Sequence, residues 1–193
     1  AVVLEELALF FPELSSVPPE IRTLDAEDWA SNWQQHFPAF QVGETLLIRP
    51  SWSDQAPTEG QAVLTLDPGQ AFGTGTHATT SLCLDVIARL ATTPQGLGQV
   101  LDVGTGSGIL ALAAAALGAS EVLACEIDPQ SRRVARENIL QNGLAEQVHV
   151  TDLPLEELRG QFNLILANIL AKENIRLHMA FLQRLSPGGH LVL

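Results

Sequence analysis

The chain has 193 residues, of which 46% are apolar and 17% are charged, enough for one well-buried domain with a short appendage. Its net charge of −12 disfavours direct nucleic-acid binding and suits a basic protein partner; we interpret its one basic cluster, Arg132, Arg133 and Arg136, as a solvated helix face. No apolar stretch is long enough to span a bilayer, so we expect a cytoplasmic protein without a membrane partner. Cys83 and Cys125 have no neighbour at metal-ligand spacing, and we interpret them as buried hydrophobic side chains, with no bound metal.

Residues 1–60 differ in composition from the rest of the chain, because they hold all three tryptophans and six prolines. Asp25 is a candidate cap for a short helix that carries Trp29 and Trp33 on one face. Gly43 to Arg49 predicts a strand. We interpret residues 1–60 as a linker and the remnant of a preceding domain, and residues 61–193 as a second domain.

From Ala62 onward, short apolar runs alternate with helical patterns. The predicted strands are Ala62–Leu66, Val100–Val103, Glu121–Ile127, Val148–Thr151, Phe162–Ala167 and a last one that begins at His190 after a turn over Ser186–Gly189. The predicted helices are Thr76–Thr92, Ile109–Leu117, Pro129–Gln141 with Asp128 as its cap, and Lys172–Leu185. This alternation indicates an α/β fold with a Rossmann-like parallel sheet in three αβα layers. Since the chain stops within an apparent strand, we expect that the sheet is truncated here after its fifth core strand.

The strongest motif is a glycine-rich turn between a predicted strand and a predicted helix. It reads Val100-Leu-Asp-Val-Gly-Thr-Gly-Ser-Gly108, and Glu126 ends the next strand, 22 residues after Gly104. Glycines let a ligand approach the backbone closely, and an acidic residue at the second strand's end can accept both hydroxyls of a ribose. The motif therefore predicts a nucleoside-binding site.

The order of the glycines separates two kinds of nucleoside ligand. A dinucleotide site needs G-x-G-x-x-G, but Ile109 and Leu110 follow Gly108 where the last glycine is needed. Asp102 would also place a negative charge near a diphosphate. A ligand that carries an ammonium and a sulfonium but no phosphate fits better, which favours S-adenosylmethionine.

Two further segments carry candidate site residues. The stretch from Asp67 to Thr80 reads Asp-Pro-Gly-Gln-Ala-Phe-Gly-Thr-Gly-Thr-His-Ala-Thr-Thr, a flexible loop in which Thr76 and Thr80 can donate hydrogen bonds to a ligand carboxylate. We interpret His77 as a capping residue in preference to a catalytic base. Asn168, after the fourth core strand, can accept a hydrogen bond from an attacking amine and aim its lone pair. Asp152 follows the third core strand, where it would meet the adenine edge, although aspartates are also common turn residues.

These motifs resemble those of the bacterial ribosomal protein L11 methyltransferase family, a group of class I S-adenosylmethionine-dependent methyltransferases. The matching stretches are Asp67–Thr80, Asp102–Gly108 and the Ala-Asn-Ile-Leu of 167–170, and the resemblance extends from Trp29 to Leu193. The chain departs from the family in having Glu126 where aspartate is usual. The predicted cofactor-binding residues are Phe72, Thr76, Thr80, Asp102, Gly104, Gly106, Gly108, Glu126, Ile127, Asp152 and Asn168, and Asn168 is also the predicted catalytic residue.

The resemblance implies methylation of lysine side chains and of the N-terminal amine of a ribosomal protein, the basic partner. It also implies that residues 1–60 are the linker and the remnant of an N-terminal substrate-recognition domain. Three alternatives stay open: a methyltransferase for a small molecule, one for glutamine in another protein, or a cofactor-binding module without catalysis. Glutamine-directed enzymes carry an N-P-P-aromatic motif, whereas here Asn168 is followed by Ile-Leu-Ala.

Overall fold

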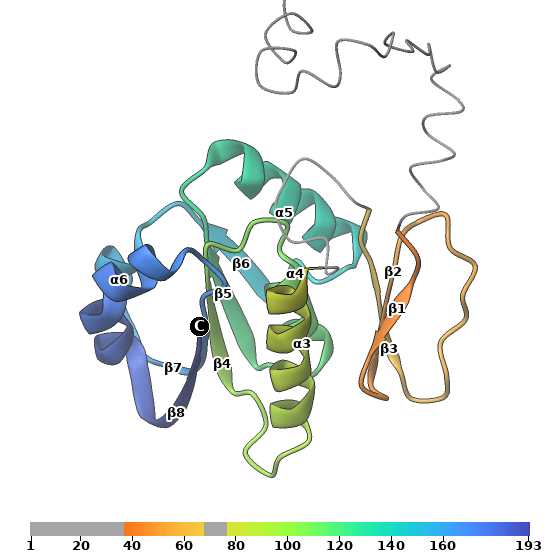
Figure 1. Ribbon diagram of the computed structural model, residues 1–193, viewed down its shortest axis with the longest axis horizontal. Helices are drawn as coiled ribbons and strands as arrows, with labels where there is room; N and C mark the ends of the chain where they lie inside the picture. Colours follow the sequence, from red (N-terminus) through yellow and green to blue (C-terminus); the bar gives the residue numbers. More distant parts are fainter. Residues whose placement is uncertain (1–36, 68–76) are drawn as a thin grey trace, which may run out of the picture. The chain divides into compact units, whose positions relative to one another are not determined.

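The computed structural model describes residues 37–67 and 77–193 (Figure 1). The chain divides into two compact units, 1–36 and Phe37–Leu193. The first unit lies outside the described residues, and so does the short helix predicted around Trp29 and Trp33. All the described helices and strands belong to the second unit.

The main sheet has five parallel strands, as predicted. They are β4 (Gln99–Val103), β5 (Glu121–Cys125), β6 (Val148–Thr151), β7 (Phe162–Leu166) and β8 (Leu185–Val192), in the spatial order β6-β5-β4-β7-β8. The chain leaves β4 toward β5 on one side and later returns to pair β7 with β4 on the other. The order therefore reverses at β4 and β7, and in open α/β sheets such a reversal opens a ligand crevice at the carboxyl ends of the strands.

Helices cover both faces of this sheet (Figure 1). They are α3 (Ala78–Ala91), α4 (Ile109–Ala116), α5 (Pro129–Gln141) and α6 (Ala171–Arg184), with a short 3-10 helix η2 (Leu155–Glu157). Since strand side chains alternate between faces, Val100 of β4 joins the core formed with α3 and α4, whereas Leu101 joins the core formed with Phe181 of α6. The predicted three-layer αβα architecture is confirmed.

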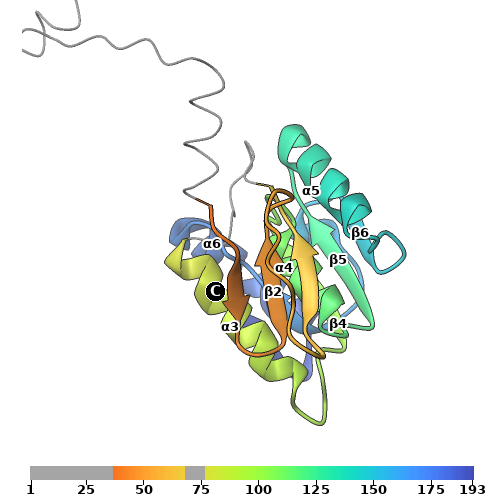
Figure 2. The ribbon, with the colours of Figure 1, turned by 90° about the vertical axis from the view of Figure 1, so that its right-hand side faces the viewer.

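Helix α4 is apolar all round, and the structure shows why. Ile109 to Ala115 are all buried. One side of α4 packs on β4 and β5, and another side packs on a second, smaller sheet of β1 (Phe40–Val42), β2 (Leu46–Arg49) and β3 (Ala62–Thr65) (Figure 2). A helix enclosed by two sheets has no solvent-facing stripe, so polar positions would cost stability.

The small sheet differs from the sequence prediction in two ways. The stretch Gly43–Arg49 forms one strand only from Leu46, because Gly43 adopts a positive φ of 54° in a turn after β1. The predicted domain boundary near residue 60 falls between β2 and β3, which pair in parallel. Residues 37–60 thus share a compact unit with the residues that come after them, and their assignment to a recognition domain stays a prediction.

The last strand also differs from its prediction. Strand β8 begins at Leu185 and not at His190, so the predicted turn over Ser186–Gly189 lies inside the strand. Its register with β7 shifts there, since Phe162 faces Leu185 while Leu164 faces His190. The extra residues form a bulge, a feature that a Pro-Gly-Gly sequence accommodates without ending the strand.

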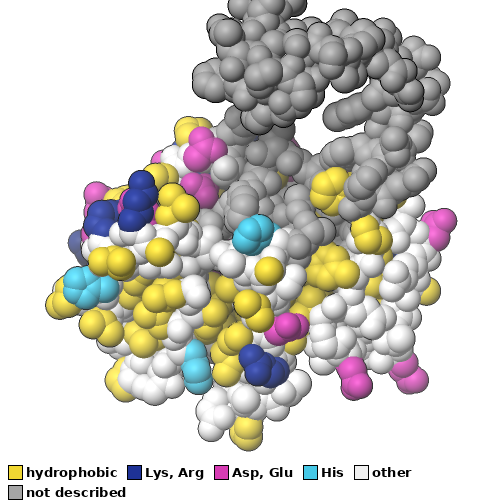
Figure 3. Space-filling view, in the orientation of Figure 1, with side chains coloured by type: hydrophobic (Ala, Val, Ile, Leu, Met, Phe, Trp, Pro, Cys, Tyr) yellow, Lys and Arg dark blue, Asp and Glu magenta, His cyan; other side chains and the backbone are white. Residues whose placement is uncertain are grey.

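One surface of the unit is notably apolar. Helix α6 exposes Ile175, Met179 and Leu182, which succeed one another at helical spacing, and Leu193 at the end of the chain is also exposed. Apolar side chains gather over this part of the molecule in the space-filling view (Figure 3). Within residues 37–67 and 77–193, no helix is long and apolar enough to cross a membrane.

Candidate active site

A cleft of about 630 Å³ lies at the carboxyl ends of β4, β5 and β7. This is the edge at which the strand order reverses. Its described lining comes from the ends of these strands, from the loops after β4, β5, β6 and β7, and from α3, α5, η2 and α6: His77, Thr79, Val103, Gly104, Gly106, Cys125, Glu126, Ile127, Ser131, Leu153, Pro154, Leu155, Glu156, Asn168, Ile169, Leu170, Glu173, Arg176 and Leu177. Its size is within the range of small-molecule sites.

The glycine turn after β4 forms the floor of the cleft. Gly104 has a φ of +70°, and its amide donates to the carbonyl of Cys125 at 2.8 Å, which ties the turn to the end of β5. A Cβ on Gly104 would come within 2.5 Å of Cγ2 of Ile169, so a side chain at this position would be strained and would clash. Glycine is therefore needed at position 104 even without a ligand.

The Glu126 side chain reaches from the end of β5 across the glycine turn. Its Oε2 accepts from the amide of Gly106 at 3.1 Å, and its Oε1 accepts from the amide of Asp128 at 3.0 Å. An ionised carboxylate has about four acceptor positions, so each oxygen can accept a further hydrogen bond. The half-buried carboxylate is thus held in place with capacity left on both oxygens.

Asp102 lies beneath the turn and does not line the cleft. It is 1% exposed and accepts from the hydroxyl of Thr105 at 2.5 Å. Burial raises its pKa to about 6, against the lowering effect of Thr105 and of the backbone amide of Ala111. Asp102 lies two residues after Val100 and therefore on the same face of β4, the face that α4 covers. It thus supports the turn from the side away from the cleft.

Asn168 lines the cleft from the loop after β7. Its Nδ2 donates to Oγ1 of Thr80 at 3.1 Å, which leaves the carbonyl Oδ1 to accept from another group. Thr80 itself is buried on α3 and does not line the cleft. At the start of α3, His77 caps the helix, since its Nδ1 accepts from the amide of Thr79 at 3.3 Å. The interpretation of His77 as a capping residue is confirmed.

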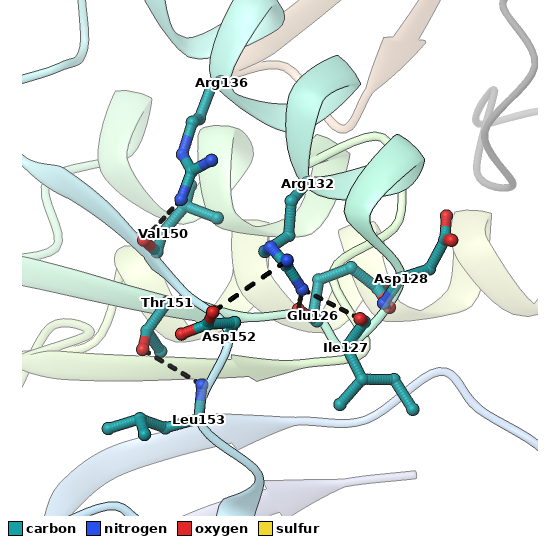
Figure 4. A network of polar contacts seen from close by, with 9 residues as sticks. All are labelled: Glu126, Ile127, Asp128, Arg132, Arg136, Val150, Thr151, Asp152 and Leu153. Carbon is teal, nitrogen blue, oxygen red and sulfur yellow. Dashed lines mark hydrogen bonds and ion pairs between the residues drawn. The ribbon is translucent and has the colours of Figure 1, made fainter.

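Arg132 lies behind the loop after β5, in a position that the sequence did not reveal. The prediction of a solvated helix face is wrong for this residue: its side chain is 15% exposed, against 72% for Arg133. Its Nη1 donates to the carbonyls of Glu126 at 2.9 Å and Ile127 at 2.8 Å (Figure 4). The helical spacing of Arg132 on α5 did not indicate this contact, because its side chain extends back along the helix to the loop that precedes α5.

Asp152 was expected beside the adenine edge. Its side chain is 68% exposed and is paired with Nη2 of Arg132 at 3.9 Å, and it does not line the cleft (Figure 4). The next residue, Leu153, does line it, and so does Ile127 on the loop after β5. These two exposed apolar side chains offer surfaces for a flat ring.

The side of the cleft formed by η2 and α6 is charged. Arg176 of α6 pairs with Glu173 on its own helix at 2.9 Å and with Glu156 of η2 at 2.6 Å. Because the pair to Glu156 spans 20 residues, only the packing of η2 against α6 brings it together. Cys125 also lines the cleft, and burial raises the pKa of its thiol to about 12, so it stays protonated and is no nucleophile.

The chain is similar along its whole length to one family of known proteins. Residues 1–193 match the family described as ribosomal protein L11 methyltransferase (PrmA). The chain belongs to the ribosomal protein L11 methyltransferase family. A relative of that name from Syntrophotalea carbinolica is 57% identical over 187 residues, which is 97% of this chain and 61% of the relative. Another, from Geobacter metallireducens, is 46% identical over 98% of this chain and 62% of the relative.

Solved structures agree with the membership in the L11 methyltransferase family. A ribosomal protein L11 methylase from Lactobacillus delbrueckii subsp. bulgaricus matches with a TM-score of 0.71 and 39% identity, over 80% of this chain and 78% of that chain. Arabidopsis thaliana protein arginine methyltransferase 10 matches with a TM-score of 0.51 and 26% identity, over 60% of this chain and 35% of that chain. The resemblance and the methyltransferase fold that the motifs predicted are confirmed, and the chain spans about three-fifths of the length of its first curated relatives.

The structure brings together about half of the predicted site residues. The cleft is lined by Gly104, Gly106, Glu126, Ile127 and Asn168. Four other predicted residues do not line it and stand behind it or beside it: Thr80, Asp102, Gly108 and Asp152. Phe72 and Thr76 lie outside the described residues. The role of each residue in cofactor binding stays a prediction.

Proposed function

We propose that the whole protein transfers methyl groups from S-adenosylmethionine to lysine side chains and the N-terminal amine of ribosomal protein L11. The observation that carries this proposal is the meeting of Glu126, Gly104 and Asn168 in one cleft at the reversal of the sheet. Membership in the L11 methyltransferase family supports the reaction class and the substrate. We place the reaction in the cytoplasm, where free cysteines such as Cys83 and Cys125 stay reduced.

The residues that line the cleft support the placement of an adenosyl group in it. The open acceptor positions on both oxygens of Glu126 match two neighbouring ribose hydroxyls. Ile127 and Leu153 would hold the adenine ring between apolar side chains, and the glycine turn at Gly104 would let the ligand approach the backbone. When bound, the cofactor supplies a methyl group already activated by its positively charged sulfur.

The chain's own task is then to hold and orient the substrate amine. Asn168 presents Oδ1 to the cleft, because its Nδ2 is engaged by Thr80. A carbonyl oxygen accepts a hydrogen bond from an amine N–H and so directs the nitrogen lone pair toward the methyl group. An acidic protein with a net charge of −12 also attracts a basic ribosomal protein.

The test separates methyl transfer from cofactor binding. Asn168→Ala should lower kcat with L11 by on the order of a hundredfold, because alignment is lost, and should leave the Kd for S-adenosylhomocysteine nearly unchanged. Asn163→Ala is the matched control, since it also removes one side-chain hydrogen bond, from the amide of Gln99 to Oδ1 at 2.9 Å, but at the opposite end of β7. Methylation is measured with radiolabelled donor, purified L11 and the full-length protein. Unchanged turnover in Asn168→Ala would remove Asn168 from the mechanism.

A second experiment tests the ligand class itself. Thermal unfolding of the protein should shift upward with S-adenosylmethionine and S-adenosylhomocysteine, since both bind only the folded state. Stabilisation by NAD alone would overturn the assignment of the cofactor. With the cofactor established, methylation of a free small molecule but not of L11 would reject the protein substrate.

A further inference from the structure

We propose that Arg132 is a positioning residue that holds the Glu126 carboxylate in the geometry needed to bind the ribose of the methyl donor. This inference deepens the proposed function and rests on it. Arg132 does not itself line the cleft among the described residues; it lies behind the loop that leaves β5 (Figure 4).

The first step is the hold of Arg132 on the loop backbone. The carbonyls of Glu126 and Ile127 both accept from its Nη1, at 2.9 and 2.8 Å. Both carbonyls lie at the end of β5, past the last residue of its ladder with β4. Charge-assisted hydrogen bonds are about twice as strong as neutral ones, so the guanidinium fixes two consecutive peptide units.

The second step runs from the backbone to the carboxylate. Glu126 Oε1 is oriented by the amide of Asp128, two residues along the same loop, and Oε2 by the amide of Gly106. Asp128 in turn caps α5, the helix that carries Arg132, by accepting from the amide of Ser131 at 2.7 Å. The loop and the first turn of the helix therefore close a ring of polar contacts around Glu126.

The third step concerns the loop after β6. Nη2 of Arg132 lies 3.9 Å from the carboxylate of Asp152, whose neighbour Leu153 lines the cleft. Arg132 thus contacts two loops that form walls of the cleft. Asp152 is largely exposed, so this ion pair adds little energy, and the main effect of Arg132 comes through the carbonyls.

Lysine cannot replace this arrangement. An arginine guanidinium is a planar fork of donors, whereas a lysine ammonium is a single point of charge on a flexible stem. Arg132 uses one arm for both carbonyls and turns the other toward Asp152. Arg132→Lys therefore keeps the charge and loses the geometry, which separates an electrostatic role from a positioning role.

The experiment compares ligand binding in full-length protein variants by calorimetry. Arg132→Ala should bind S-adenosylhomocysteine about tenfold more weakly, the size expected for one lost hydrogen bond to a charged group. The same variant should lose less affinity for the 2′-deoxyribose counterpart of this ligand, because that ligand retains only one of the two hydroxyls that would donate to Glu126. Arg132→Lys should resemble Arg132→Ala. Arg133→Ala is the matched control, since it removes the same charge from the neighbouring, exposed position.

A second readout needs no ligand. The amides of Gly106 and Asp128 donate to Glu126, so their hydrogen exchange should quicken in Arg132→Ala and Arg132→Lys but not in Arg133→Ala. The inference about Arg132 would be overturned if both Arg132 variants bound the two ligands as the wild type does and showed unchanged hydrogen exchange. The proposed function would not be affected by that result. A wild type that binds no S-adenosylhomocysteine would overturn the proposed function, while the exchange data would still decide whether Arg132 holds Glu126.

Discussion

Gly104→Ala should destabilise the protein through two separable effects. The φ of +70° at position 104 costs an alanine roughly 1–2 kcal/mol, because its Cβ approaches the following carbonyl. The new Cβ would also lie 2.5 Å from Cγ2 of Ile169, nearly an ångström inside the 3.4 Å at which ordinary contact begins. Crowding of this kind adds about 1–3 kcal/mol, so the total should be roughly 2–5 kcal/mol.

Chemical denaturation of four variants measures these contributions. In an Ile169→Ala background the clashing methyl is absent, and the remaining Cβ of residue 169 is 4.0 Å away. The cost of Gly104→Ala should then fall to roughly 1–2 kcal/mol, the backbone part alone. An equal cost in both backgrounds would show that Ile169 does not limit the turn. No cost in either would refute the left-handed geometry of Gly104.

Two further predictions concern the groups behind the cleft. The pKa of Asp102 is about 6 in the folded protein and near 3.8 when unfolded, so the native state binds the proton more tightly and stability should fall as pH rises from about 4 to 6. The fall should amount to about 3 kcal/mol; Asp102→Asn should lack it, and parallel stability–pH curves for the two proteins would contradict the burial effect. Thr80→Val should lower kcat by releasing the amide of Asn168, whereas Thr80→Ser keeps the hydroxyl and should retain turnover; equal kcat values would exclude an orienting role for Thr80.

Local sequence was sufficient to predict most helices and strands of the α/β unit. The alternation of apolar strands and helical patterns is a short-range property, so four of the five core strands and all four helices could be predicted to within about two residues at each end. The start of α5 was predicted to the residue, because Asp128 and Pro129 satisfy capping requirements that involve only adjacent positions. Strand β8 was misjudged, since its Pro-Gly-Gly bulge is held by pairing with β7.

The sequence also identified the residues that line the floor of the candidate site. Gly104 and Glu126 come directly after parallel strands and Asn168 comes two residues after one, and the carboxyl ends of such strands meet at one edge of a sheet. Their convergence is therefore a consequence of strand order alone. The face of the sheet on which a side chain lies depends on its position in the two-residue alternation of the strand. This alternation places Asp102 beneath the glycine turn and not in the cleft.

Only the tertiary structure decided which polar side chains from different elements contact one another. Arg132 had the sequence context of a solvated helix face, yet its guanidinium also reaches Asp152, 20 residues further along the chain on the loop after β6. Arg176 and Glu156 meet because two distant elements pack together. Sequence motifs reflect the conformational requirements of adjacent residues. Contacts between separate elements depend on how those elements pack, and short-range patterns carry no information about that packing.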